Sequence, residues 1–119
     1  MKRTAMFAGG AALAAVGLLA ASALSGTAWA EDGQQLYKRY CQSCHGTSGK
    51  GDGPASRILK PPPGDLGATL KGMKDQDITK IIREGGRAVG KSAAMPAFSS
   101  KLNEEQTKTL VEFVKKFVK

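Results

Sequence analysis

The five residues Cys41-Gln42-Ser43-Cys44-His45 contain both cysteines and the single histidine of this 119-residue chain. Residues three and four positions apart lie on the same face of a helical turn. If the segment is helical, Cys41, Cys44 and His45 therefore point toward one common object beside the helix. Two thiols and an imidazole at this spacing make the segment the first candidate for a functional site.

A covalently attached haem would use all three groups at once. The two thiols form thioether bonds to the vinyl groups of the cofactor, and the imidazole ligates the iron from one side. Both cysteines are consumed in this arrangement, so the sequence predicts one haem c and no disulfide. Cys41, Cys44 and His45 are the predicted cofactor-binding residues, and His45 is a predicted ligand of the iron.

Three other uses of the motif fit the rest of the chain less well. A thioredoxin-like dithiol needs no adjacent histidine and follows a strand in an α/β fold, which this sequence does not offer. A structural zinc site takes four ligands, so a carboxylate would have to join the three groups present. A disulfide between Cys41 and Cys44 would close a very short loop and restrict the unfolded chain little. These alternatives stay open, with haem attachment preferred.

The first thirty residues are typical of a secretory signal peptide rather than of a folded domain. They begin with two basic residues, continue through the uncharged segment 5–24, and end on the small-x-small pattern Ala28-Trp29-Ala30. We therefore expect cleavage after Ala30, a mature domain over residues 31–119, and a periplasmic location. The alternative is a retained membrane anchor, because the apolar segment approaches the length that spans a bilayer.

The mature domain would be small and basic. It holds 89 of the 119 residues, and without Lys2 and Arg3 the formal net charge of +8 falls to +6. A domain of this size needs a further source of core, and a large apolar macrocycle fixed to the chain would supply it. Few aromatic side chains are present to do so instead: Tyr37, Tyr40, Phe98, Phe113 and Phe117.

Apolar residues at helical spacing predict two helices before residue 90. The first runs from about Gly33 into the cysteine motif, with apolar side chains on one face. The second runs from about Gln76 to Glu84. Asp75 can cap its start, and the pair Gly85-Gly86 ends it.

A third helix is predicted at the end of the chain. It begins after Asn103, which together with Gln106 has the character of a capping box. An apolar stripe at helical periods follows: Leu110, Phe113, Val114, Phe117 and Val118. Since no alternating run marks a strand, the predicted fold class is all-α.

The segment 46–70 is rich in glycine and proline, which interrupt long helices and strands. A short helical turn can start at Pro54 and carry Ile58 and Leu59 inward. Neither side of the segment is large enough to be a domain alone. We therefore expect an ordered loop rather than a linker.

In the order of these features the chain resembles the class I c-type cytochromes over nearly the whole predicted mature domain. The resemblance implies a small cytochrome c fold of about three helices around one haem. It also implies iron ligation by His45 and by a methionine that maps onto Met95, in the segment Met95-Pro96-Ala97-Phe98. A glycine that lets the last helix cross the first matches Gly33, opposite Phe113. The carbonyl of Pro54 is implied as the acceptor of the proton on the second ring nitrogen of the histidine.

Two methionines of the predicted mature domain lie far enough along the chain to return to the iron. Met95 precedes a proline that stiffens the loop, and it lies shortly before the last helix. Met73 lies in a polar setting at a helix start. Met95 is preferred as the second axial ligand, chiefly on the resemblance, and Met73 is the alternative. Core packing is the other use of either side chain.

The predicted site leaves little chemistry beyond a one-electron change. With both axial positions filled by the protein, the iron can only change between ferric and ferrous states. No nucleophile with a base, no paired carboxylates and no phosphate loop accompanies the motif. We therefore expect an electron carrier that is not an enzyme and has no small-molecule substrate. An enzyme or gas sensor, in which Met95 leaves the iron, is the alternative.

The positive charge predicts partners with acidic docking surfaces. Redox encounters of this kind have small interfaces and short lifetimes. Lys50, Lys91 and Lys101 flank the loops expected near the haem edge. The expected partners are redox proteins, which can include a membrane respiratory complex, and the chain itself is expected to be a monomer. Nucleic acid is not expected, because the sequence has no aromatic or arginine-rich platform.

Overall fold

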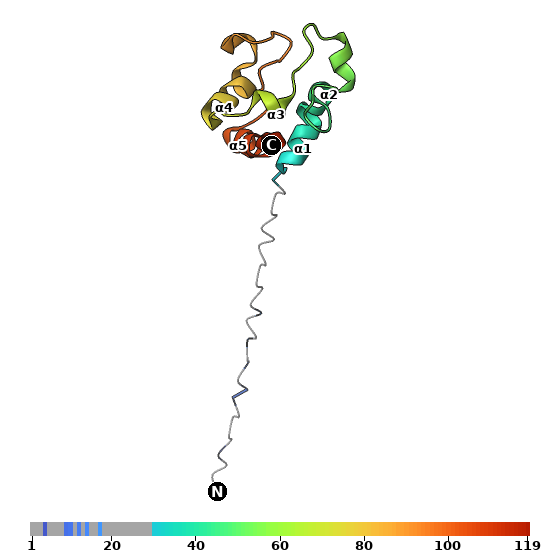
Figure 1. Cartoon of the computed structure of the whole chain (residues 1–119). Coiled ribbons are helices and arrows are strands. Elements are labelled where there is room, and N and C mark those ends of the chain that lie inside the picture. The colour runs from blue at the N-terminus through green and yellow to red at the C-terminus, as the bar shows by residue number, and fades with distance from the viewer. Residues whose placement is uncertain (1–3, 5–8, 11, 13, 15–16, 18–29) are drawn as a thin grey trace.

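The computed structural model describes residues 4, 9–10, 12, 14, 17 and 30–119. Its α-helices are α1 (Gly33–Tyr40), α2 (Gln42–His45), α3 (Leu66–Thr69), α4 (Asp75–Glu84) and α5 (Glu104–Val114). The described residues also form three 3-10 helices: η1 (Pro54–Ile58), η2 (Arg87–Val89) and, after α5, η3 (Lys115–Phe117). The described residues contain no strand, which confirms the all-α class (Figure 1). The predicted signal peptide, residues 1–30, lies outside the described residues except at isolated positions.

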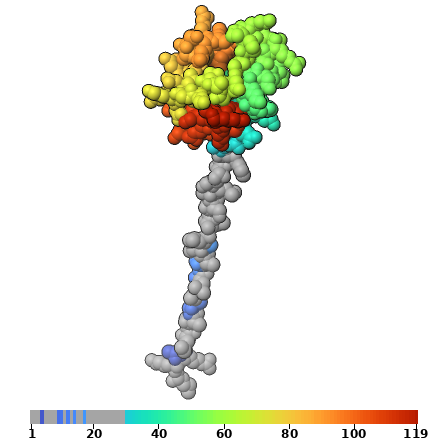
Figure 2. Space-filling model, in the orientation of Figure 1, coloured from blue at the N-terminus to red at the C-terminus, as the bar shows by residue number. Residues whose placement is uncertain are grey.

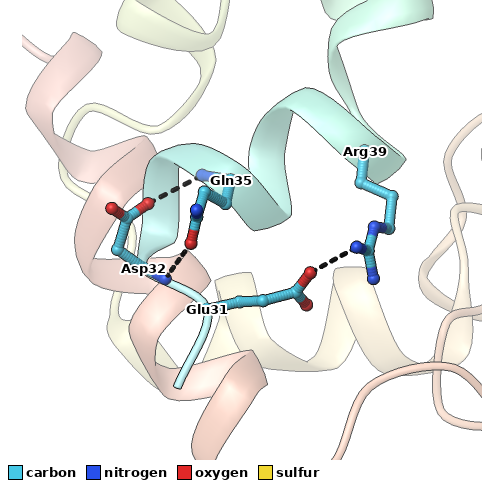
Figure 3. Close-up of polar contacts among 4 residues, drawn as sticks. All are labelled: Glu31, Asp32, Gln35 and Arg39. Atoms are coloured by element: carbon cyan, nitrogen blue, oxygen red, sulfur yellow. Dashed lines mark hydrogen bonds and ion pairs between the residues drawn. The ribbon is translucent and has the colours of Figure 1, made fainter. Parts of the chain in front are cut away.

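The start of α1 is fixed by a reciprocal cap (Figure 3). The Asp32 carboxylate accepts a hydrogen bond from Gln35 N at 2.8 Å, and Asp32 N donates to Gln35 Oε1 at 3.1 Å. Two of the amide groups that a helix start leaves free are thereby satisfied. Glu31 forms an ion pair of 2.5 Å with Arg39, which lies in the last turn of the helix. Residues 31 to 39 thus form one locally stabilised unit.

Helices α1 and α5 cross at close range. A Cβ atom added to Gly33 would lie 2.5 Å from Phe113 Cβ and 2.9 Å from the Thr109 carbonyl oxygen, so only glycine fits there. Beside the crossing, the rings of Tyr37 and Phe113 lie 5.3 Å apart. The close approach of Gly33 and Phe113 that the family resemblance implied is therefore present. In Figure 1 the two helices lie together at the base of the fold.

The core lies between these two helices and α4. Leu36 and Leu110 are fully buried, and Ile78 and Ile82 of α4 are buried in the same cluster. The predicted stripe of α5 is correct for Leu110 and Val114, but it does not continue as one helix. The chain tightens into η3 after Val114, and Phe117 is only partly buried.

The start of α4 differs from its prediction. Asp75 is the first helical residue, and Lys74 precedes the helix without a side-chain cap. The Asp75 carboxylate instead pairs with Lys115 at 2.6 Å, and it lies in the first turn, where negative charge suits the helix dipole. The predicted stop is correct, because Gly85 ends the helix with a φ of +82°.

The segment 46–70 is ordered and contains two short helical turns. The predicted turn begins at Pro54, but Ile58 is 80% exposed, so its predicted inward orientation is wrong. Leu59, in contrast, is partly buried. The second turn, α3, was not predicted, and Asp65 caps it by accepting a hydrogen bond from Gly67 N at 2.8 Å.

No helix in the described part of the chain has the length and apolar character that crossing a membrane requires.

Candidate functional site

One cavity of about 540 Å³ brings together the residues singled out in the sequence. Cys41, Cys44, His45 and Met95 all line it, although fifty residues separate the last two. The volume is within the range of about 300–1,000 Å³ that small-molecule and cofactor sites occupy. The segment around residues 59–64 and the segment around residues 86–96 both line the cavity. Both segments lie in the upper part of the molecule in Figure 2.

The walls of the cavity are predominantly apolar. Helix α4 contributes Ile78, Ile81 and Ile82, and the loop before α3 contributes a row of prolines. Apolar walls of this kind favour a large hydrophobic ligand. The aliphatic, proline and phenylalanine side chains of the lining are Leu59, Pro61, Pro62, Pro63, Leu66, Leu70, Ile78, Ile81, Ile82, Ala94, Pro96, Phe98 and Val114, together with Met95.

The cysteine motif is a single helical turn set at an angle to α1. Cys41 has a φ of −120° and serves as the end of α1 and the start of α2, so the predicted first helix is divided at this residue. His45 N donates to the Cys41 carbonyl at 2.9 Å, which closes the turn. The buried Tyr37 hydroxyl donates to the Gly46 carbonyl at 2.6 Å and holds the far end of the turn against α1.

The state of the two thiols bears on the alternatives. Neither cysteine is in a disulfide. Burial raises the pKa of Cys41 to about 12, and the nearby Cys44 adds to the shift. Redox-active dithiols instead have a lowered cysteine pKa, because the thiolate is the reactive form. The environment of Cys41 therefore does not suit a thioredoxin-like reaction.

The surroundings of His45 favour the neutral imidazole. Burial lowers its pKa, and the neutral ring is the form that ligates a metal ion. Its Nδ1 atom is buried and has no hydrogen-bond partner. The predicted hydrogen bond from this ring to the Pro54 carbonyl is therefore not formed. The loop is held by the backbone of the motif instead, because Gly51 N donates to the His45 carbonyl at 2.8 Å and Gly53 N to the Cys44 carbonyl at 3.2 Å.

The two methionines occupy different places. Met95 lines the cavity, whereas Met73 packs against the core and does not line it. Met95 is tied into its loop by its own backbone, since its carbonyl accepts from Gly86 N at 3.0 Å and its N–H donates to the Ser92 carbonyl at 3.3 Å. Of the two candidates, Met95 is therefore the one beside Cys41, Cys44 and His45.

The three lysines expected near the cofactor do not lie together. Lys91 and Lys101 line the cavity. Lys50 does not line it, and instead lines a separate hollow of about 610 Å³ together with Lys71, Lys116 and Lys119. Lys50 lies in the turn between Gly46 and Gly53, where Gly46, Gly49 and Gly51 all have positive φ.

Several lining residues were not identified from the sequence. The prolines at 61–63 were assigned only to a loop, and Ile81 only to a helix face. Neither pattern contains information on which side of the loop faces the cavity. Arg39 and Ser43 also line it, from α1 and from inside the motif.

The residues present fit a covalently held haem. Two unpaired thiols, a neutral imidazole and a thioether converge on an apolar cavity, which is the donor set that c-type haem attachment and axial ligation use. A structural zinc ion fits less well. The described residues contain no group of three or more histidine, cysteine, aspartate or glutamate side chains placed to share a metal ion.

Comparisons with known proteins agree with this donor set. The sequence profile of the family described as "Cytochrome C oxidase, cbb3-type, subunit III" matches residues 28–114. Among solved structures, the KustC0563 c-type cytochrome superposes with a TM-score of 0.59 at 27% sequence identity. That match covers 75% of this chain and 100% of the other. No curated protein sequence gives a significant match.

Proposed function

This chain belongs to the family described as cytochrome c oxidase, cbb3-type, subunit III, and on that premise we propose that it is an exported carrier of single electrons with one haem c. Electron transfer through covalently bound haem is the activity of c-type cytochromes. The proposal adds to this that His45 and Met95 are the axial ligands, that the count is one haem, and that the protein is not an enzyme. The single pair of cysteines supports the count.

Each proposed site residue has a separate role. Cys41 and Cys44 would hold the cofactor by thioether bonds, and His45 would ligate the iron as a neutral imidazole. Met95 would supply a soft thioether, which favours ferrous iron and raises the reduction potential. The bound haem supplies the one-electron change between ferric and ferrous iron. The apolar side chains around it exclude water.

The observation that carries the proposal is the convergence of Cys41, Cys44, His45 and Met95 on one apolar cavity. A methionine beside the motif supports a site in which both axial positions are filled by the chain. Such a site has no position for oxygen, peroxide or another substrate, which is the reason for proposing a carrier.

The location and partners of the protein belong to the same proposal. Residues 1–30 would direct export to the periplasm and be cleaved after Ala30. Lys91 and Lys101 at the cavity support docking to acidic surfaces of redox proteins. The description of the matched family supports a respiratory oxidase complex as one such partner, met by this chain as a monomer.

Mass spectrometry and carbon monoxide binding test the proposal together. The protein from cells that mature cytochromes should have the mass of residues 31–119 plus one haem, and the reduced form should bind carbon monoxide poorly. A mass without haem would remove the proposal altogether. Ready binding of carbon monoxide to the haem protein would instead favour an enzyme or gas sensor with an open iron site.

Covalent attachment has a separate control within the motif. Cys41→Ala and Cys44→Ala should each lose one thioether link, and the double variant should release haem into acidified organic solvent. Gln42→Ala, between them at a position that does not line the cavity, should keep the haem in the protein.

A further inference from the structure

Two glycines directly after α4 contact the backbone around Met95. Gly86 N donates to the Met95 carbonyl at 3.0 Å. The Gly86 carbonyl accepts from Lys91 N at 2.7 Å and from Val89 N at 3.2 Å. The buried Gly86 therefore hydrogen-bonds both the middle and the end of the loop from 87 to 95.

Space, rather than backbone conformation, requires glycine at position 86. Its φ of −65° and ψ of −38° are ordinary helical values that any residue adopts. A Cβ atom added there would overlap the Ser92 carbonyl oxygen and lie 3.3 Å from Met95 Cβ. At Gly85 an added Cβ would also lie 3.0 Å from the Met95 carbonyl oxygen. The loop thus closes against a surface without side chains.

The segment that follows Met95 is hydrogen-bonded to the same helix, α4. Phe98 N donates to the Ile82 carbonyl at 3.0 Å, and Ser99 N donates to the Arg83 carbonyl at 3.2 Å. The Arg83 guanidinium in turn donates to Thr107 Oγ1 of α5 at 3.3 Å. The end of α4 is therefore a fixed support for the segment on both sides of Met95.

A methionine side chain has three rotatable bonds, so its sulfur is placed only as well as its backbone is. We propose that Gly86 is a positioning residue: its lack of a side chain lets the 87–95 loop close, and the closed loop holds the Met95 sulfur at the cavity. This inference rests on the proposed ligation of iron by Met95. It assigns Gly86 a role in setting how firmly the sixth position is occupied.

Gly86→Ala in the mature haem protein tests the proposal, with Gly90→Ala as the matched control. Gly90 lies in the same loop, has a φ of +74°, and would meet no atom within 4 Å if it carried a Cβ. The control therefore strains the backbone without pressing on Ser92 or Met95. Both variants can lose stability, but only Gly86→Ala should affect the iron.

The expected result is a more open sixth position in Gly86→Ala. Carbon monoxide binds the form without the methionine, so its apparent affinity follows the population of that form. We expect an affinity increase of about tenfold, equal to ~1.4 kcal/mol, a weaker sulfur-to-ferric-iron absorption band and a lower reduction potential. Gly90→Ala should keep the wild-type values of all three. Wild-type values for Gly86→Ala, or equal changes in both variants, would overturn the proposal.

Two further measurements separate this inference from its premise. In a Met95→Ala background, Gly86→Ala should change carbon monoxide affinity no further, because its effect passes through the methionine. An additional change there would show that Gly86 acts elsewhere.

If Gly86→Ala does not yield haem protein, Ser92→Ala replaces it. This variant removes the side-chain oxygen that accepts a hydrogen bond from the Ala94 N–H at 3.1 Å, and it adds no bulk. An unchanged carbon monoxide affinity in Ser92→Ala would then count against the inference. Ready binding of carbon monoxide to the wild-type protein would instead refute the assignment of Met95 as the ligand.

Discussion

The Tyr37 hydroxyl connects α1 to the backbone directly after the cysteine motif. Its hydrogen bond to the Gly46 carbonyl is buried, and the pKa of Tyr37 is raised from 10.0 to about 12, mainly by burial and further by Cys41 and Asp52. A raised pKa of an acid means that the folded state favours the neutral hydroxyl. Its contribution to stability is therefore complete below pH 10 and is lost as the pH rises toward 12.

Tyr37→Phe should lower the free energy of unfolding by about 1–3 kcal/mol at neutral pH, because the buried Gly46 carbonyl loses its donor. The variant should also lose less stability than the wild type between neutral pH and about pH 11. Denaturant unfolding followed by circular dichroism at both pH values measures the two effects. Tyr40→Phe is the control at the neighbouring cavity tyrosine. Equal alkaline losses in wild type and Tyr37→Phe would contradict this account.

The two methionines allow a second residue-level prediction. Met95→Ala should abolish the sulfur-to-ferric-iron band, lower the reduction potential and open the iron to carbon monoxide, because water or a nearby lysine such as Lys91 is a harder donor than a thioether. Met73→Ala should keep all three properties and lose only packing. Absorption spectra and a redox titration of both variants distinguish them. The reverse pattern would assign the ligand to Met73.

At this scale the sequence was informative wherever spacing alone sets the geometry. Cys41, Cys44 and His45 lie on one turn, so a local rule was enough to bring them together. The partner of the histidine ring was not predictable in the same way. The position of the Pro54 carbonyl depends on how the glycine-rich loop turns, and no residue pattern specifies that path.

Among the elements, the crossing of α1 and α5 has the least tolerance for change. Gly33→Ala would place a methyl group against Phe113 Cβ and the Thr109 carbonyl, both on a rigid helix. We expect it to destabilise the fold by about 1–3 kcal/mol, as overpacked cores do. Urea unfolding measures the loss. Gln34→Ala, at the exposed neighbouring position, should stay within about 0.5 kcal/mol of wild type, and a similar value for Gly33→Ala would mean that the helices can move apart.

Long helices were predicted better than short ones. Eight or more residues of α1, α4 and α5 repeat an apolar pattern, and Asn103 begins α5 with the expected reciprocal cap: Gln106 N donates to Asn103 Oδ1 at 2.8 Å. Four-residue α3 has no room for a repeat, and its one indication is the cap at Asp65. The predicted inward orientation of Ile58 was wrong for a related reason: a 3-10 helix has about three residues per turn, so neighbouring side chains point to different sides.

For the molecule as a whole, the distribution of lysines matters more than their number. If docking uses the cavity side, electron transfer to a physiological partner should slow as salt rises, since exposed charges are screened beyond about 8 Å at physiological ionic strength. Replacing Lys91 and Lys101 with glutamine should reduce both the rate at low salt and its salt dependence. Stopped-flow measurements over a range of salt concentrations test this.

The matched control replaces Lys50 and Lys108, which have the same combined charge but do not line the cavity. This pair should leave the salt dependence nearly unchanged. Equal losses in the two double variants would mean that net charge, and not a docking face, governs the encounter.

The packing of α1 against α5 holds the two ends of the domain together by contacts as well as by the continuous chain. The contact joins residue 33 to residue 113, while the exposed turn at Ile58 lies between them. A single proteolytic nick at that turn would divide the domain into a haem-bearing fragment with α1 and α2 and a second fragment with α4 and α5. The contacts between α1 and α5 would keep the two fragments associated. Met95, on the second fragment, would then still reach the cofactor attached to the first.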